Sequence, residues 1–265
     1  MLWLIGLNLS TKVKLIKLPN MCKIYNSKNY WKYLSMMALI VFSLSTKAAN
    51  RFWISTTAAN WNNTSNWSTT SVGAGGASVP RNADVAIFNV LANGDCNTNA
   101  VVNVQGFNIN GYTGTISQNA NTITIGNAGF NQNSGTFAGG TVNMTVNTAA
   151  FTLSGGTFTS TSANLSVGGS QGSTTIFTHS AGTFNYNNGT VVFNPKVPGC
   201  VAGSYAIDVI PNTVFYDLTI NGTQGCGNLA NLTSAGADNL DVSNNFSAEE
   251  GVYFNDIYTL RCKLF

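Results

Sequence analysis

Charged side chains are scarce in this sequence. Only 8% of the 265 residues are Asp, Glu, Lys or Arg, against roughly 25% in an ordinary soluble domain. The formal net charge of +3 arises from the first 50 residues, which hold seven lysines and no acid. The remainder carries five basic and nine acidic residues, a balance of 5 − 9 = −4. A basic surface that neutralises phosphates is therefore missing, and we predict no nucleic-acid partner.

Residues for hydrolytic or metal chemistry are few as well. The single histidine, His179, is the only base available to a catalytic triad, and we interpret it as a packed or corner residue of the fold. Carboxylates that could cleave a glycan are spread over more than one repeat, at Asp208, Asp217, Asp238 and Asp241. No Cys-x-x-Cys motif occurs, which argues against zinc. We predict no enzyme activity, no catalytic residue, no cofactor and no metal.

The apolar run near the N-terminus, residues 36–44, is too short for a bilayer, which needs about 20 apolar residues. Lysines precede it and small residues follow it, so we predict a helical secretory signal within residues 1–49. Met21 would begin a signal of ordinary length, which predicts that the true start of translation lies after residue 1. We expect a secreted or cell-surface protein with no stable membrane span after cleavage; whether the leader is cleaved or retained stays open.

Four cysteines remain after this leader: Cys96, Cys200, Cys226 and Cys262. In an oxidising compartment they allow two disulfides in any of three pairings. We favour a disulfide between Cys200 and Cys226, because each follows a glycine and the segment between them has about the length of one repeat.

Asn, Thr, Ser and Gly supply most of the polarity. These residues disfavour helices, because Gly loses backbone entropy there and Asn, Ser and Thr compete for backbone hydrogen bonds. Short segments alternate Thr or Asn with Ile, Val or Met, for example residues 122–125, 141–146 and 190–193. This alternation is typical of strands with one buried face, so the fold class is all-β.

One phrase recurs three times between residues 130 and 184. Each copy has an aromatic residue, a Gly five residues later and a second aromatic seven residues later. The three aromatic pairs are Phe130 and Phe137, Phe151 and Phe158, and Phe177 and Phe184. The copies begin 21 and 26 residues apart, a spacing typical of solenoid repeats. A weaker fourth copy is predicted to begin at Phe246.

Stacking these repeats predicts a right-handed parallel β-helix with an internal aromatic column at Phe130, Phe151 and Phe177. The Gly before each second aromatic, at 135, 156 and 182, is expected to form a corner with positive φ. Asn side chains at corners are expected to form amide ladders. A sandwich of antiparallel hairpins is the alternative, since Asn-Gly pairs occur, but it gives no reason for identical corners at repeat spacing.

The chain divides into a signal segment (1–49), a Trp-rich module (50–90), β-helix coils (91–254) with an insertion near 195–211, and an irregular tail (255–265). The basic residues in that tail and the lack of a closing cap lead us to predict a truncated product. Trp53, Trp61 and Trp67 are expected to cap the open end of the first coil. The alternative is a platform on which sugar rings stack.

The N-terminal sequence resembles that of a known family. Trp53, Asn60-Trp61, Asn66-Trp67-Ser68 and Val79-Pro80, followed by the Ser-Gly-Gly-Thr-Phe repeats, are similar to large secreted surface proteins of Bacteroidetes. The resemblance implies an adhesin-like β-solenoid, commonly exported with a C-terminal sorting domain. That family more often has Gly or Asp just before the Asp-Val pair, so we interpret Asp84 as a turn residue rather than a cation ligand.

Thr-rich solenoids can also present flat Thr arrays to ice. Thr122 and Thr124, Thr141 and Thr145, and Thr174 and Thr175 do not follow one register along the sequence, which argues against that function here. We therefore predict a structural or adhesive segment, a fragment of a larger adhesin, whose partners are surface glycans or other cell-surface proteins. The alternative is a carbohydrate-binding or polysaccharide-degrading β-helix protein.

Overall fold

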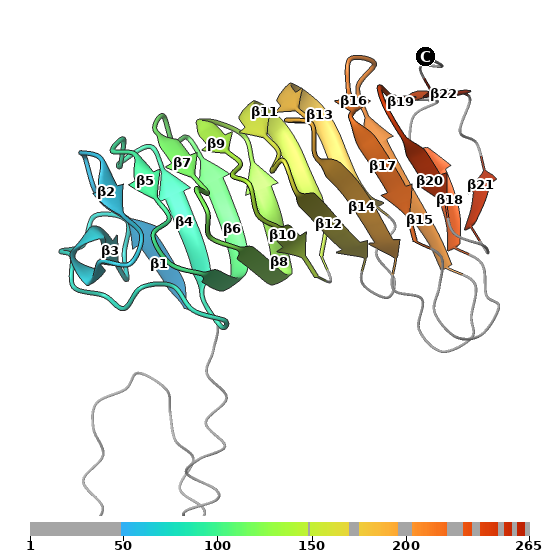
Figure 1. Ribbon diagram of the computed structural model, residues 1–265. Coiled ribbons are helices and arrows are strands. Elements are labelled where there is room, and N and C mark those ends of the chain that lie inside the picture. The colour runs from blue at the N-terminus through green and yellow to red at the C-terminus, as the bar shows by residue number, and fades with distance from the viewer. Residues whose placement is uncertain are drawn as a thin grey trace, which may run out of the picture. The chain divides into compact units, whose positions relative to one another are not determined.

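The computed structural model describes residues 49–147, 149–169, 175–195, 203–221, 230–234, 239–248, 252–255 and 259–262. All of them belong to one compact unit, Lys47–Phe265. The described residues form an all-β structure whose strands succeed one another in chain order (Figure 1). The only helical element among them is a 3-10 turn, η2 (Thr64–Asn66). The predicted signal helix and the Cys200–Cys226 disulfide lie outside the described residues.

Parallel strands form three rows, which we name A, B and C. Row A contains β1 (Asn50–Trp53), β4 (Val85–Asn89), the second halves of β6 (Val102–Asn110) and β8 (Ile123–Gln132), the first halves of β11 (Phe151–Thr159) and β13 (Thr175–Asn185), β15 (Gly203–Val209), β18 (Ala230–Ser234) and β21 (Val252–Asn255). Each strand pairs in parallel with the next one in this row.

Row B contains β2 (Ala59–Asn60), β5 (Cys96–Asn97), β7 (Thr115–Ser117), β9 (Thr136–Ala138) and the second halves of β11 and β13. A separate three-stranded parallel sheet follows it along the chain, made of β16 (Val214–Phe215), β19 (Asn239–Val242) and β22 (Thr259–Cys262). Phe215 packs against Phe184 of row B with 5.6 Å between the ring centroids.

Row C contains the first halves of β6 and β8, then β10 (Met144–Val146), β12 (Asn164–Gly169), β14 (Thr190–Pro195), β17 (Asp217–Ile220) and β20 (Phe246–Ala248). The chain visits row C, row A and row B in turn and then returns to row C. The one antiparallel strand pair among the described residues joins β1 to β3 (Trp67–Ser68). The antiparallel sandwich is therefore wrong, and the parallel rows are compatible with the expected β-helix.

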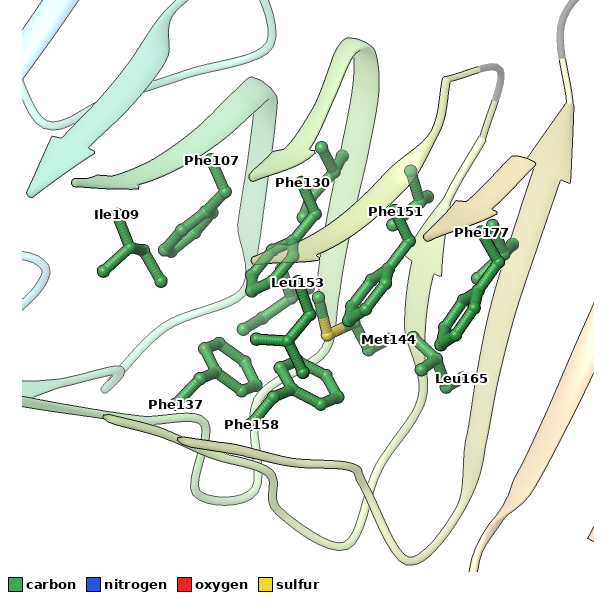
Figure 2. Close-up of a cluster of buried hydrophobic side chains, with 14 of the residues drawn as sticks. Phe107, Ile109, Phe130, Phe137, Met144, Phe151, Leu153, Phe158, Leu165 and Phe177 are labelled. Atoms are coloured by element: carbon green, nitrogen blue, oxygen red, sulfur yellow. The ribbon is translucent and has the colours of Figure 1, made fainter. Parts of the chain in front are cut away.

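The aromatic column forms as the repeated phrase predicts, and a second column lies beside it. Phe130, Phe151 and Phe177 stack with 4.8 Å between successive ring centroids and interplanar angles of 8° and 4°. Phe158 lies between Phe137 and Phe184 in a second column, at 5.1 and 5.8 Å. Figure 2 shows the two columns facing each other across the interior, and rings of one column meet rings of the other edge to face. Both geometries suit the quadrupole of an aromatic ring.

The glycine corners are also confirmed. Gly135, Gly156 and Gly182 have φ angles of +62°, +74° and +91°. These glycines lie against one another in successive repeats: a Cβ atom on Gly156 would be 2.5 Å from the carbonyl oxygen of Gly135. Each corner therefore needs Gly twice over, for its backbone conformation and for the close approach of the neighbouring corner.

Three expectations about the second half differ from the structure. Phe246 pairs with Leu218 in row C rather than continuing the column of Phe177 in row A, so the fourth copy of the phrase is wrong. Part of the expected insertion, residues 196–202, lies outside the described residues. The strand β15 within it pairs with β13 and continues row A. Likewise β22, in the predicted irregular tail, pairs with β19.

Replacing one ring of the column tests its contribution to stability. Phe151→Ala removes a fully buried ring that stacks on both neighbours, so we expect the free energy of unfolding to fall by about 3–5 kcal/mol. Thr152→Ala is the matched control, because Thr152 lies next to it on the same strand and is not buried; its expected cost is below about 1 kcal/mol. Urea denaturation measures both. Equal losses would contradict a stabilising column.

A glycine pair separates backbone strain from steric contact. Gly156 and Gly76 both have positive φ, but a Cβ atom on Gly76 would meet nothing within 4 Å. Gly76→Ala should cost about 1–2 kcal/mol from backbone strain. Gly156→Ala should cost a further 1–3 kcal/mol, roughly, because of the clash with Gly135. Thermal unfolding of the two variants measures the difference, and a Gly76 variant as unstable as the Gly156 variant would refute the close contact.

Candidate functional site

The outer face of row B carries a ladder of threonines. Thr115, Thr136, Thr157 and Thr183 occupy equivalent positions in four successive repeats and pair in register. Each precedes an inward residue, so period-two alternation places the threonine outside. The first three are partly exposed and Thr183 is exposed. Because neighbouring parallel strands lie about 4.7–4.9 Å apart, the hydroxyl groups form a regular row.

A second rank runs beside this ladder, two residues further along each strand. Its members are Asn97, Ser117, Ala138, Thr159 and Asn185. The amide of Asn185 donates a hydrogen bond to the Thr159 hydroxyl at 3.3 Å. At the N-terminal end, the Thr115 backbone N–H donates to Asp95 Oδ1 at 2.8 Å. The face therefore presents hydroxyl and amide groups, with one carboxylate that is already engaged at its edge.

Row C carries a less regular array. Thr124, Thr145 and Ser166 pair in register, and Thr219 continues the same position, but Val192 interrupts it. Thr124 and Thr145 therefore do share a register, whereas Thr175 lies on row A, so the three groups of threonines do not form one array. The register depends on strand position, which the spacing of threonines along the sequence does not reveal.

A pair of tyrosines follows the last strand of row B and the first strand of the separate three-stranded sheet. Tyr186 follows β13 directly, Tyr216 follows β16, and their rings stack with centroids 5.6 Å apart. Both are only partly buried, and Tyr186 packs with its buried part against the hydrophobic core. Neither hydroxyl hydrogen-bonds to a described residue. Sequence reasoning missed this pair because the two residues are 30 positions apart and lie outside the repeated phrase.

The three tryptophans are buried at the N-terminal end of the core. Trp53, Trp61 and Trp67 expose 1%, 2% and 0% of their surface. Trp61 stacks on Phe107 at 5.6 Å, and Trp67 meets both other indoles edge to face. This packing favours the capping interpretation and leaves no indole face open to a sugar ring.

Hydrogen bonds fix the indoles in place. The Trp53 indole N–H donates to the Gly94 carbonyl at 2.9 Å, and the Tyr112 hydroxyl donates to the same oxygen at 2.6 Å. The Trp67 indole N–H donates to the carbonyl of Trp61 at 2.8 Å. Burial is the main reason that the pKa of Tyr112 is raised, with the neighbouring Cys96 and Asp95 adding to it. The tyrosine is therefore a neutral, structural group.

His179 has the structural role expected of it. It aligns with Leu153 in the preceding repeat, exposes 2% of its surface and accepts or donates hydrogen bonds at both ring nitrogens. Nδ1 lies 2.7 Å from the Thr213 hydroxyl and Nε2 lies 3.4 Å from the Gly182 carbonyl. Gln132, at the same position one repeat before Leu153, bonds the Gly135 carbonyl in the same way. Each polar side chain ties its strand to a glycine corner.

The candidate carboxylates do not converge. Asp208 lies on row A, Asp217 on row C and Asp241 on the sheet of β16, β19 and β22; Asp238 lies outside the described residues. Asp217 Oδ1 accepts hydrogen bonds from the side chain of Asn244 and the backbone of Asn245. No group of three metal-ligating side chains occurs in the described part of the chain. The register thus assembles no pair of carboxylates for glycan cleavage.

Two further expectations concern single residues. Asp84 is a turn residue as predicted: its carboxylate accepts from the Arg81 backbone N–H at 3.0 Å and lies 3.8 Å from the Arg51 guanidinium. Amide ladders form at Asn110 with Asn133, at 2.7 Å, and between Asn194 and Asn221.

Cys96 is a free, fully buried thiol that occupies a core position of row B. Burial raises the pKa of this thiol, and Asp95 raises it further. A protonated thiol enclosed in apolar surroundings is unreactive.

Acidification tests the buried histidine. Burial lowers the pKa of His179 from its usual value of 6.5, against a smaller opposing effect of the Gly182 hydrogen bond. The unfolded chain therefore binds the proton more tightly than the folded one. Its contribution to stability is complete above pH 6.5 and is lost as the pH falls through the lowered folded-state pKa.

We expect the melting temperature to fall on acidification from about pH 8 to about pH 5, the range in which histidine titrates. The variant His179→Leu with Thr213→Val should show a flatter profile, because leucine is the residue of the preceding repeat and valine removes the orphaned hydroxyl. Differential scanning calorimetry measures both. Parallel profiles for the two proteins would show that His179 is not the titrating group.

No helix of the described residues is long and apolar enough to cross a membrane. Comparisons with protein-family models, with curated proteins and with solved structures find no match in any of the three. The candidate site must therefore be judged by its own chemistry: a face of hydroxyl and amide groups on row B, adjoined by a stacked pair of tyrosines.

Proposed function

We propose that this chain is a secreted or cell-surface structural and adhesive segment built as a right-handed parallel β-helix. The three rows of in-register parallel strands support the β-helix, since the chain visits rows C, A and B in a fixed order. Crossovers between parallel strands are right-handed in nearly all proteins, which supports the handedness. The observation that carries the adhesive function is the combination of an aromatic interior with an outer ladder of threonine hydroxyls on row B.

Such a scaffold suits adhesion rather than catalysis. Each repeat presents the same small side chains at the same positions, so the fold builds long uniform surfaces. A catalytic site instead needs different groups that converge on one point, and the described carboxylates lie on different sheets or rows. The resemblance to secreted surface proteins of Bacteroidetes agrees with a role at the cell exterior, as part of a larger surface protein.

Retention on surfaces tests the adhesive function. Beads coated with the full-length chain should remain attached under flow to at least one class of polysaccharide- or protein-coated surface. A variant with Phe151→Ala and Phe158→Ala, which disrupts both aromatic columns, should lose that retention because the outer ladders depend on the core.

Retention no better than that of uncoated beads on every surface would refute adhesion. Release of reducing ends or unsaturated products from a polysaccharide panel would instead favour the polysaccharide-degrading alternative. Cryo-electron microscopy of the same protein would test the β-helix independently, since stacked parallel strands repeat at about 4.8 Å along the axis.

A further inference from the structure

Charge is absent from the central part of the molecule. The sequence contains no Asp, Glu, Lys or Arg from Cys96 to Pro195. This stretch includes row B from β5 to β13 and row C from β6 to β14. A partner bound there cannot be held by ion pairs, and an ionic partner would lose its hydration without compensation. The surface therefore fits an uncharged partner whose binding is insensitive to salt.

The row B threonines supply the polar contacts for such a partner. None of the hydroxyl groups of Thr115, Thr136, Thr157 and Thr183 hydrogen-bonds to another described residue, although all four are at least partly exposed. Each hydroxyl can donate one hydrogen bond and accept two. Repeated at the strand spacing, they match a partner that also repeats hydroxyl groups along an extended chain.

The tyrosine pair is an independent observation next to the last strand of row B. Among the described residues between 49 and 248, four aromatic side chains are not fully buried: Phe52, Tyr186, Tyr216 and Phe246. Among these four, only the two tyrosines stack on each other. Tyr186 directly follows Asn185, the last member of the second rank of row B. A rigid aromatic pair with free hydroxyls combines an apolar surface with a polar tip, the character of aromatic residues at binding sites.

We propose that the outer face of row B and the Tyr186–Tyr216 pair together bind a neutral, extended polysaccharide. The threonine hydroxyls would exchange hydrogen bonds with sugar hydroxyls along the chain. The tyrosine rings would contact the C–H faces of a sugar at one end and set the register. This inference rests on the proposed adhesive function and specifies its partner.

The chemistry of the face disfavours other partners. Anionic glycans and nucleic acids need cations, and the sequence from 96 to 195 has none. A protein interface is usually anchored by large side chains in a desolvated centre, whereas the row B ladder contains no side chain larger than Asn. Two carboxylates beside the uncharged stretch, Asp95 just before β5 and Asp217 opposite Thr190, already accept hydrogen bonds from the protein itself.

Paired substitutions test the site in the full-length chain. Thr136→Val with Thr157→Val removes two ladder hydroxyls while it keeps size and β-propensity. Thr124→Val with Thr145→Val makes the same change on row C and is the matched control. Tyr216→Ala removes one ring of the pair, and Tyr216→Phe keeps the ring. Binding is measured by affinity electrophoresis and calorimetry against soluble β-glucan, xylan, mannan and dextran, with polygalacturonate as the charged comparison.

We expect the unsubstituted chain to bind at least one neutral polysaccharide. The row B double variant should bind it about tenfold more weakly, since each lost hydrogen bond is worth about 0.5–1.5 kcal/mol. Tyr216→Ala should weaken binding similarly, by about tenfold, and Tyr216→Phe should restore most of it. The row C variant should bind within about twofold of the unsubstituted chain, and raising the salt tenfold should change binding by less than about twofold.

Several results would overturn the inference: no binding to any neutral polysaccharide, equal weakening by the row C variant, or binding that salt abolishes. An effect of the row B variant on ice-crystal growth without glycan binding would assign the ladder to ice instead. If the coated beads still adhere while soluble polysaccharides do not bind, the glycan inference fails and the adhesive function stands. If the beads do not adhere but the polysaccharide binds, the adhesive function fails and the glycan-binding site stands.

Discussion

The in-register stacking of parallel strands is the constraint on which the rest of this structure depends. Each side chain meets its counterpart in the neighbouring repeat, so a residue is tolerated only if it packs well against a copy of itself or a close substitute. Phenylalanine meets this condition by offset stacking, as Phe130, Phe151 and Phe177 show. Glycine meets it at the corners, where a side chain would strike the carbonyl of the preceding corner. The buried Gln132 and His179 fit because each bonds its own corner.

The same strands make the core and the candidate site. In the sequence Gly156-Thr157-Phe158, the glycine turns the corner, the threonine faces outward and the phenylalanine faces inward. Because the inward phenylalanine is repeated in register from one repeat to the next, the threonine before it is aligned as well. A binding face that follows from stacking is rigid before it meets a partner, so little ordering of side chains opposes association.

The first half of the fold could be predicted from the sequence because the phrase around Phe130, Phe151 and Phe177 states one repeat in full. Beyond Phe184 the connections lengthen: Phe177 pairs with Ile207, 30 residues later. The aromatic at 246 matches the offsets of the phrase but belongs to row C, because offsets of five and seven do not record which row a strand joins. The threonine ladder could have been predicted from the sequence, because Thr136, Thr157 and Thr183 lie inside the repeated phrase. The tyrosine pair could not, because only folding brings Tyr186 next to Tyr216.

Stacking also offers a structural reason for the missing charges, and this bears on how the surface is interpreted. A charged residue repeated in every coil would lie about 4.8 Å from its copies, and like charges directly opposite are destabilising. Neutral ladders are thus partly a requirement of the fold, and threonine suits strands in its own right. Packing explains the tyrosine pair only in part: Tyr186 lies against the hydrophobic core, but both rings are partly exposed and their hydroxyls bond no described residue. Its position beside the ladder is therefore the more specific evidence for a ligand.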